Sequence, residues 1–295
     1  MQNNRISLLA AVLIVLVGVA WLSGVFDREP STIEVPSVDI PTGEVDRIRV
    51  QGPEWTVEVT REGGVWQVAE PVPARADSNA VVRLLDSLSE LKLNTVVSTS
   101  PDRHGNYGVD QTSARYLTLG WADEEELLLV AEQGPDFSSS YVRLGETPAV
   151  YSSSRIALPA NADLFRDKTL INLTPYTVRA VDISAPDFAY RAESGPEGWA
   201  LADGTPLDSV SVSSWLRRFS PLRMDGFRDD LLRDSLSVTH RAVFEIEGGP
   251  RLEVQFEEQD EDLLAWSSQG PGVMRSFVSR LGTLIQEPGS LQPPQ

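Results

Sequence analysis

The sequence predicts an α+β protein, in which an N-terminal transmembrane helix is followed by two tandem, similar β-rich lobes. Three observations favour this class. An uncharged apolar run occupies residues 6–26, alternating apolar residues separated by turn residues follow it, and the pattern of the first half recurs in the second half. Since domains commonly hold 50–250 residues, a chain of 295 residues has room for an anchor and two modest lobes.

The apolar run over residues 6–26 is long enough to cross a membrane. As an α-helix it would span roughly 30 Å, which is the thickness of the hydrocarbon core of a bilayer. The run continues past Ala20 with large apolar side chains instead of a small-residue cleavage site, so we expect a retained anchor. Arg5 precedes the run and Asp27 follows it. Because positive charge favours the cytoplasmic side, we expect residues 1–5 in the cytoplasm and the bulk of the chain outside it.

Residues 27–43 contain three Pro and several Ser and Thr, a composition that favours an extended stalk. The first lobe is expected over residues 44–174, and it begins as a β-meander whose strands are separated by Gly-containing turns. Asp77 is then placed to cap a helix that runs to Leu91, because apolar residues recur after it at spacings of three and four. Further strands are expected over residues 116–121, 126–130, 141–144 and 149–151.

The second half of the chain repeats the pattern of the first. Val45–Trp66 aligns with Val178–Trp199 without a gap, and the two Trp residues coincide. Asp208 then corresponds to Asp77, ahead of a helix with its own apolar stripe. The shared order, spacing and residue types favour an internal duplication.

The second lobe is expected over residues 175–287. On the alignment Leu85 and Leu216 are equivalent core positions of the two helices. Residues 273–285 have a helical period of apolar side chains, which predicts a C-terminal helix. Residues 288–295, rich in Pro and Gly, are expected to be a disordered tail.

Composition limits the classes of partner. The formal net charge is −18, from 43 acidic and 25 basic residues. Nucleic acids and anionic lipid surfaces are recognised through Lys and Arg, so neither is an expected partner of the lobes. The acidic excess is typical of a soluble surface, and attraction of a cationic partner is the alternative. Because the chain has no Cys, it cannot form disulfides.

Motifs that carry chemistry are missing. His104 and His240, the two histidines, lie in polar contexts and are interpreted as surface or loop residues. The sequence has no HExxH, no G-x-S-x-G elbow and no Gly-rich phosphate loop. The acidic clusters at residues 123–126 and 257–262 lack the alternating ligand spacing of a Ca²⁺ loop and are expected to flank hairpin turns. We therefore assign no catalytic, cofactor-binding or metal-binding residue.

Aromatic residues are a further candidate, because rows of aromatic side chains can bind sugars or peptides. Trp66, Trp199 and Trp215 fall at equivalent or striped positions and are predicted to be core residues. The segment 135–141 has aromatic residues near its end and in its middle, and it could line a groove, although a plain loop explains it equally well.

Four groups of residues carry a resemblance. They are W-x-V-x-x-P…DS-x-A-V-x-x-L-L-x-x-L at Trp66–Leu88, Tyr107-Gly108-Val109-Asp110, Ser140-Tyr141-Val142-Arg143 with Val150-Tyr151, and Phe165-Arg166-Asp167-Lys168. Together they resemble a bacterial family of unknown function, whose members are single-span, membrane-anchored envelope proteins encoded beside gliding-motility-type ABC transporters. The resemblance implies a place at the bacterial cytoplasmic membrane, with an ABC-2-type permease and its extracytoplasmic auxiliary subunit as partners. It carries no catalytic residue.

Three classes of function remain open. The expected one is a non-enzymatic, extracytoplasmic accessory or interaction subunit of an ABC-type transport system. The alternative is an envelope ligand- or polymer-binding protein that uses the cleft between the lobes, and the third class is an enzyme. Polar and aromatic residues that converge in an inter-lobe cleft would favour the second class, and a buried carboxylate pair or triad would favour the third.

Overall fold

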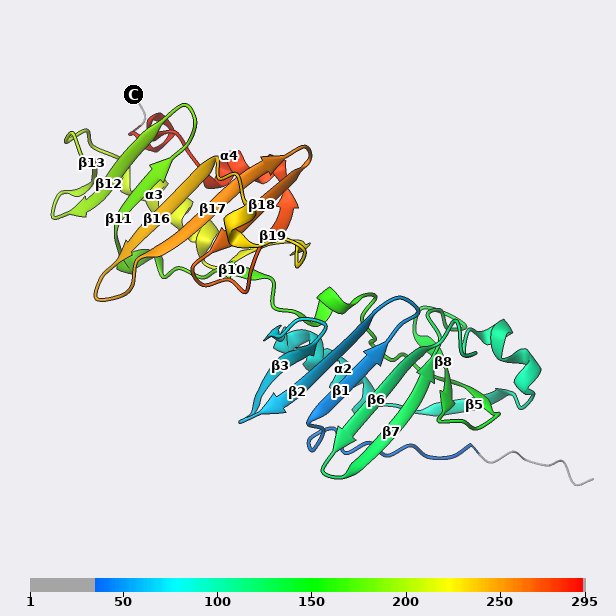
Figure 1. Cartoon of the computed structure of the whole chain (residues 1–295). Coiled ribbons are helices and arrows are strands. Elements are labelled where there is room, and N and C mark those ends of the chain that lie inside the picture. Colours follow the sequence, from blue (N-terminus) through cyan, green and yellow to red (C-terminus); the bar gives the residue numbers. More distant parts are fainter. Residues whose placement is uncertain (1–34, 294–295) are drawn as a thin grey trace, which may run out of the picture.

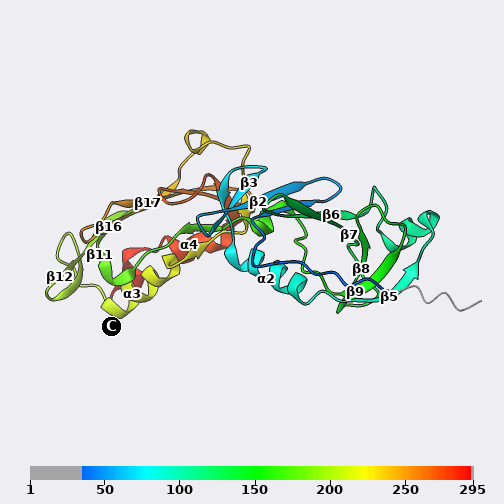
Figure 2. The same ribbon diagram turned by 90° about the horizontal axis from the view of Figure 1, so that it is seen from below.

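Two lobes lie end to end in the computed structural model, which describes residues 35–293 (Figure 1). Each lobe is built on one large antiparallel sheet. A view turned by 90° shows that a helix lies under one face of each sheet (Figure 2). The hydrophobic core of each lobe therefore lies between its sheet and its helix.

The predicted fold class is wrong for this part of the chain. Antiparallel sheet predominates over residues 35–293, and the longest helix there has 12 residues. In that range no helix is both long enough and apolar enough to span a membrane. The structure thus does not support the predicted transmembrane helix, and residues 6–26 lie outside the described residues, as does the segment 1–5.

The first lobe holds a nine-stranded sheet in the order β4-β3-β2-β1-β6-β7-β8-β9-β5. Its elements, in chain order, are β1 (Arg47–Gln51), β2 (Thr56–Glu62), β3 (Val65–Glu70), β4 (Ala74–Arg75), α2 (Ser78–Ser89), β5 (Leu93–Ser98), a 3₁₀ helix (Pro101–Tyr107), β6 (Arg115–Trp121), β7 (Glu124–Val130), β8 (Ser139–Leu144), β9 (Val150–Ser154) and a second 3₁₀ helix (Ala162–Phe165).

The second lobe holds an eight-stranded sheet in the order β13-β12-β11-β16-β17-β18-β19-β15, and β10 pairs with β14 beside it. Its elements are β10 (Thr169–Ile171), β11 (Val178–Ser184), β12 (Ala189–Gly195), β13 (Gly198–Leu201), α3 (Ser209–Leu216), β14 (Leu222–Arg223), β15 (Gly226–Phe227), β16 (His240–Ile246), β17 (Leu252–Gln259), β18 (Asp262–Ser267), β19 (Met274–Phe277) and α4 (Leu281–Leu284), with short 3₁₀ turns at Pro175–Thr177, Arg217–Phe219, Arg233–Ser235, Val278–Arg280 and Pro288–Leu291.

The two sheets share one strand order when β1–β3 are matched with β11–β13, β6–β9 with β16–β19, and β5 with β15. The strand register repeats as well. Arg47 lies opposite Thr60 in the first lobe, and Ala180 lies opposite Glu193 in the second, which are the positions that the sequence alignment pairs. Because a slip of one residue would turn every side chain to the other face, the common register supports an internal duplication.

Both helices begin with the same cap. The Asp77 carboxylate accepts hydrogen bonds from the backbone N–H groups of Asn79 and Ala80, and the Asp208 carboxylate does the same at the start of α3. Such caps satisfy N–H groups that have no partner within the helix. The two Asp residues explain why helices α2 and α3 begin where they do.

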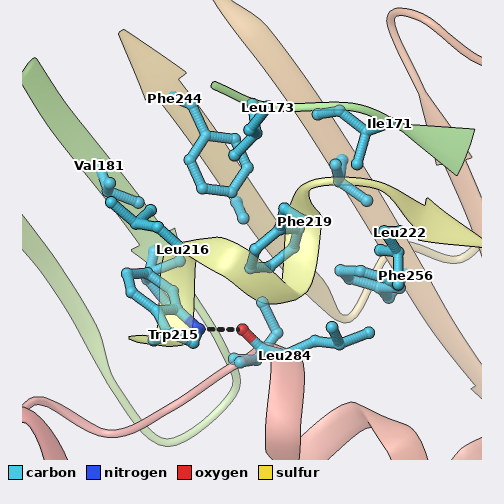
Figure 3. Close-up of a cluster of buried hydrophobic side chains, with 14 of the residues drawn as sticks. Ile171, Leu173, Val181, Trp215, Leu216, Phe219, Leu222, Phe244, Phe256 and Leu284 are labelled. Atoms are coloured by element: carbon cyan, nitrogen blue, oxygen red, sulfur yellow. Dashed lines mark hydrogen bonds between the residues drawn. The ribbon is translucent and has the colours of Figure 1, made fainter. Parts of the chain in front are cut away.

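The apolar stripes of the helices differ in one respect from the prediction. Leu216 is buried as expected, whereas Leu85 is only partly buried. Leu84, one residue earlier, is fully buried and packs in the first core together with Val81 and Leu88. Trp215 occupies the corresponding place in α3, where its indole Nε1 donates to the backbone oxygen of Leu284, 2.8 Å away (Figure 3).

The C-terminal segment contradicts the predicted helix over residues 273–285. Met274 to Phe277 form strand β19, in which buried and exposed side chains alternate, and only a short helix follows. The predicted disordered tail also differs from the structure. Leu291 is buried, and its carbonyl oxygen accepts a hydrogen bond from the Asp208 N–H. This hydrogen bond holds the backbone of Asp208, the residue that caps α3. Residues 294–295 lie outside the described range.

The predicted stalk over residues 27–43 is described from Val35 onward. Val35 and Val38 pack against the core of the first lobe, and Ile40 is buried in it. The described half of the predicted stalk is therefore part of the first lobe, because its apolar residues find a place on the core.

Candidate functional site

The junction between the lobes is a short connector, residues 165–170, with one end in each core. Phe165 is buried in the core of the first lobe and Leu170 in that of the second. On the first lobe, the N–H of Asp77 donates to the Phe165 carbonyl at 2.8 Å, and Ala76 forms an antiparallel bridge with Arg166. On the second lobe, β10 pairs with β14. The connector is thus held by backbone hydrogen bonds on both sides.

Arg166 is the central side chain of this junction. Although it follows the first lobe directly, its guanidinium forms two hydrogen bonds, of 2.6 and 2.8 Å, with the carboxylate of Asp229 in the second lobe. Its Cζ lies 3.6 Å from the centre of the Phe227 ring, and its Nη1 lies 3.4 Å from a carboxylate oxygen of Asp163. The side chain is 2% exposed. Paired hydrogen bonds and ring stacking are the contacts at which Arg is most effective.

Arg223 makes a second bridge in the opposite direction. It lies in β14 of the second lobe, and its guanidinium binds the Asp77 carboxylate of the first lobe at 2.9 Å. It also lies 3.6 Å from Asp167 in the connector. Asp77 therefore caps α2 with one carboxylate oxygen and binds the other lobe with its second oxygen. Lys168 adds a hydrogen bond of 2.8 Å from Nζ to the carbonyl of Asp225.

A hollow of about 450 Å³ lies beside the connector. Its lining is entirely polar, and two of the lining groups, Arg75 and Asp167, already form an ion pair of 3.4 Å. Sites for small molecules are mostly apolar with a few polar groups, which this lining does not resemble. Within residues 35–293, no three or more His, Asp or Glu side chains are placed to hold a metal ion.

Comparison with known proteins gives a family. Residues 66–241 match the family described as "Domain of unknown function (DUF4340)". The chain belongs to the DUF4340 family. No curated protein matches the chain, and no solved structure matches it. The predicted resemblance is thereby confirmed to the extent of a family of unknown function.

The DUF4340 match begins at β3 in the first lobe and ends at β16 in the second, so it contains the whole connector and both pairs of inter-lobe bridges. The junction therefore lies within the part of the chain that matches the family.

His104 of this DUF4340 chain was interpreted as a surface or loop residue; it lies in the connection between β5 and β6 and is buried there, so it is not a surface residue. Arg143 donates to its Nδ1 at 2.6 Å, and its Nε2 lies 2.9 Å from the carbonyl oxygen of Pro148. Because Arg can only donate, Nδ1 accepts and Nε2 carries the proton. His104 is the buried residue of the 3₁₀ helix Pro101–Tyr107, which is followed by Gly108 in a left-handed conformation. Nearby, hydrogen bonds from Thr112 lower the pKa of Asp110 to about 2.

The acidic clusters, the Trp residues and His240, which the sequence analysis also considered, lie in hairpins and in or near the cores. The acidic clusters flank hairpin turns, as predicted, at β6–β7 and β17–β18. Trp66 and Trp215 are core residues, and Trp199 is partly buried against the second core. His240 is mostly buried beside Glu258 and not on the surface.

The structure brings together residues that sequence reasoning did not connect. Asp77 was assigned only as a cap, and Arg223 and Asp229 were not assigned at all. The available signal was the group Phe165-Arg166-Asp167-Lys168, which the resemblance included. The group itself does not indicate which residues it binds, because those residues lie on distant segments of the chain.

Proposed function

We propose that this DUF4340 protein is a non-enzymatic accessory subunit of a bacterial ABC-type transport system related to those of gliding motility. It acts on the extracytoplasmic side of the cytoplasmic membrane, by contact with an ABC-2-type permease and the auxiliary subunit of that permease. The observation that carries the proposal is the ion-paired junction, which makes one platform of two lobes.

The charged side chains of the connector are all engaged in holding the lobes. Arg166 binds Asp229, Asp167 binds Arg75, and Lys168 binds a backbone carbonyl. A catalytic site needs groups that are free to act on a substrate, as in a general acid or base within reach of the reacting proton. A docking platform needs fixed geometry, because rigid surfaces lose less conformational freedom on binding. The junction favours the second role.

Two pairs of carboxylates at the junction each bind one guanidinium. Asp163 and Asp229, whose side chains are 38% and 40% exposed, bind Arg166. Asp77 and Asp167, whose side chains are 18% and 21% exposed, bind Arg223. Carboxylates that are shared with one Arg have the properties of an ion-pair network. This arrangement supports contact and not turnover as the mode of action.

The proposed location rests on the sequence. Residues 6–26 are uncharged and apolar, and Arg5 lies on the side that we expect in the cytoplasm. The partners rest on the family resemblance, which carries the transporter context. Confinement near a membrane raises the effective concentration of a membrane partner to about millimolar, so that a modest interface is sufficient.

The alternative is a protein that binds an envelope ligand or polymer between its lobes. The hollow of about 450 Å³ at the junction favours it by size. Its polar lining, with Arg75 and Asp167 already paired, gives an apolar or aromatic ligand face little to contact. We therefore favour the accessory subunit.

A gene deletion tests the proposal. In cells that carry an affinity tag on the neighbouring permease, deletion is expected to reduce transporter assembly and transport, and the full chain supplied in trans is expected to restore both. A version that starts at Val35 keeps the packing of Ile40 and should fold without restoring function. Undiminished assembly and transport in the deletion strain would refute the proposal.

A further inference from the structure

A pocket of about 560 Å³ opens on the second lobe. Its lining comes from strands β11, β12 and β13, from the 3₁₀ turn Pro175–Thr177 and from the end of helix α3. Strand β12 and helix α3 lie at the end of the second lobe that is away from the first lobe in both views (Figures 1 and 2). The pocket shares no lining residue with the polar hollow at the connector, so it is a separate feature of the molecule. Its volume falls within the range of roughly 300–1,000 Å³ that is typical of small-molecule sites.

Aromatic and apolar residues form part of this lining. We call it the Trp199 pocket, because the partly buried Trp199 borders it. The N–H of Leu207 donates to the backbone oxygen of Trp199 at 2.8 Å, which fixes the position of this residue on the edge strand β13. Leu216, which is buried, and Tyr176, which is 82% exposed, border the pocket as well. The pocket thus offers ring and aliphatic surface, as sites for small molecules do.

Arg217 borders the Trp199 pocket with a guanidinium that forms no ion pair within residues 35–293. Its Nη2 donates to Oγ of Ser214 at 3.0 Å, and its Nη1 lies 3.5 Å from Oγ of Ser213. No carboxylate of the described residues comes within 4.0 Å of the guanidinium nitrogens, which is the limit for an ion pair. In a chain with 43 acidic and 25 basic residues, Arg217 therefore keeps a positive charge that is available to a ligand.

The other charged groups at the pocket do not cancel the charge of Arg217. None of the described residues that line the pocket is acidic. Arg179 also borders it, but Arg179 forms an ion pair with Glu247, so these two charges offset each other. The lining and Glu247 together therefore carry one positive charge.

The duplication provides an internal reference for the Trp199 pocket. On the alignment of the two lobes, Arg217 corresponds to Asp86, and Trp199 corresponds to Trp66. Trp66 is 7% exposed and lies in the first core, whereas Trp199 is only partly buried. Because the two lobes share one strand order, the fold itself requires neither an Arg at position 217 nor open space beside the Trp. These differences favour a role in binding over a role in folding.

We propose that the Trp199 pocket binds a small organic carboxylate, whose negative charge pairs with Arg217 and whose ring or aliphatic body lies against Trp199 and Tyr176. This inference goes beyond the proposed function and does not depend on it, because the pocket lies within the second lobe and not at the junction that carries the proposed function.

The single available guanidinium favours a carboxylate over a phosphate ester. The planar fork of an Arg side chain matches the two oxygens of a carboxylate, and one positive charge balances a monoanion. A phosphate ester carries a charge of about −1.5 to −2 at pH 7, and Arg179 does not supply a second positive charge because it is paired with Glu247. Ser194 and Ser213, which also line the pocket, have hydroxyls that can donate further hydrogen bonds to a carboxylate.

Titration calorimetry with four probes tests the proposal. The full chain is placed in nanodiscs of zwitterionic lipid, and protein-free nanodiscs supply the background. We expect 2-naphthoate to bind with a Kd below about 1 mM. Acetate, which has no ring, 2-naphthamide, which has no charge, and 2-naphthyl phosphate, which has too much charge, should each bind about tenfold more weakly or worse.

The other outcomes of this titration overturn the inference. If 2-naphthoate does not bind, the pocket is not a carboxylate site. If the amide binds as well as the carboxylate, or the phosphate binds better, the role of the Arg217 charge is wrong. If acetate binds as well as 2-naphthoate, the contact with the aromatic residues is wrong.

Two variants of the full chain locate the binding. Arg217→Gln removes the available charge and should weaken the binding of 2-naphthoate about tenfold or more. Arg83→Gln, the matched control, removes an exposed Arg from helix α2 of the first lobe and should leave the affinity unchanged. A cation near the end of α3 also favours the helix itself, so the unfolding temperature of both variants is measured. If Arg217→Gln lowers that temperature but not the affinity, or if both variants weaken binding equally, the inference fails.

Discussion

At the scale of single residues, Arg166 is a buried charge whose closest contacts come from the other lobe. Its two terminal nitrogens bind Asp229, and its plane lies on Phe227, although its Nε has no hydrogen-bond partner among the described residues. Removing water from a guanidinium is costly unless such contacts replace the solvent. Both contacts come from the other lobe, so these two hydrogen bonds and the ring contact form only when the lobes are docked.

Substitution of Arg166 therefore has a predictable effect. Arg166→Ala leaves Asp229 without its partner and opens a space beside Phe227, and it should lower the free energy of unfolding by about 3 kcal/mol. Arg47→Ala, which removes an exposed ion pair with Glu125, is the control and should cost less than about 1 kcal/mol. Urea denaturation of the full chain measures both. Equal effects of the two substitutions would contradict the role of Arg166.

At the scale of elements, the sequence predicts the strands and helices whose signals are local. β1 to β3 alternate buried and exposed residues, and Asp77 and Asp208 cap the helices as expected. The segment 273–285 misled, because its apolar residues follow a helical period although residues 274–277 form a strand, in which Ser276 is buried and Phe277 is 66% exposed. The strand forms because Met274 pairs with Ala265 in β18, which is a tertiary contact. His104 misled for the same reason, since its partners are distant in the chain.

Substitutions on helix α2 test which face of the helix packs against the core. Leu84→Ala removes a fully buried side chain and should lower the free energy of unfolding by about 2–5 kcal/mol, because a cavity remains. Val82→Ala, on the same helix but 48% exposed, should change it by less than about 0.5 kcal/mol. Urea denaturation separates the two. If the Val82 variant were the less stable one, the orientation of the helix would be wrong.

At the scale of the whole molecule, the junction could not be predicted from the sequence. Arg166 and Asp229 are separated by 63 residues, and Asp77 and Arg223 by 146. No local pattern pairs such residues, because their proximity follows from the placement of two complete lobes. What the sequence offered was the duplication and the boundary near residue 174, which locate the connector but not the bridges that lock it.

The locked junction predicts that the lobes move as one body. Because the chain has no Cys, Val82→Cys on α2 and Val210→Cys on α3 introduce two unique sites for spin labels, and both positions are exposed. Double electron–electron resonance on the full chain should give one narrow distribution of distances between the two labels. Arg166 of the connector binds Asp229 of the second lobe, and Arg223 of the second lobe binds Asp77 of the first, so two separate bridges hold the lobes together. Arg166→Ala should broaden that distribution, whereas Arg47→Ala should not.

A broad distribution in the wild type would mean that the lobes swing freely. The junction would then be a hinge, and the proposed accessory function would lose the rigid arrangement of the two lobes on which it depends. A narrow distribution that survives Arg166→Ala would instead assign the rigidity to the backbone of the connector, to β10 and to Arg223. Breaking Arg223 as well would then decide between them, because its bond to Asp77 is the remaining side-chain bridge from β14 to the cap of α2.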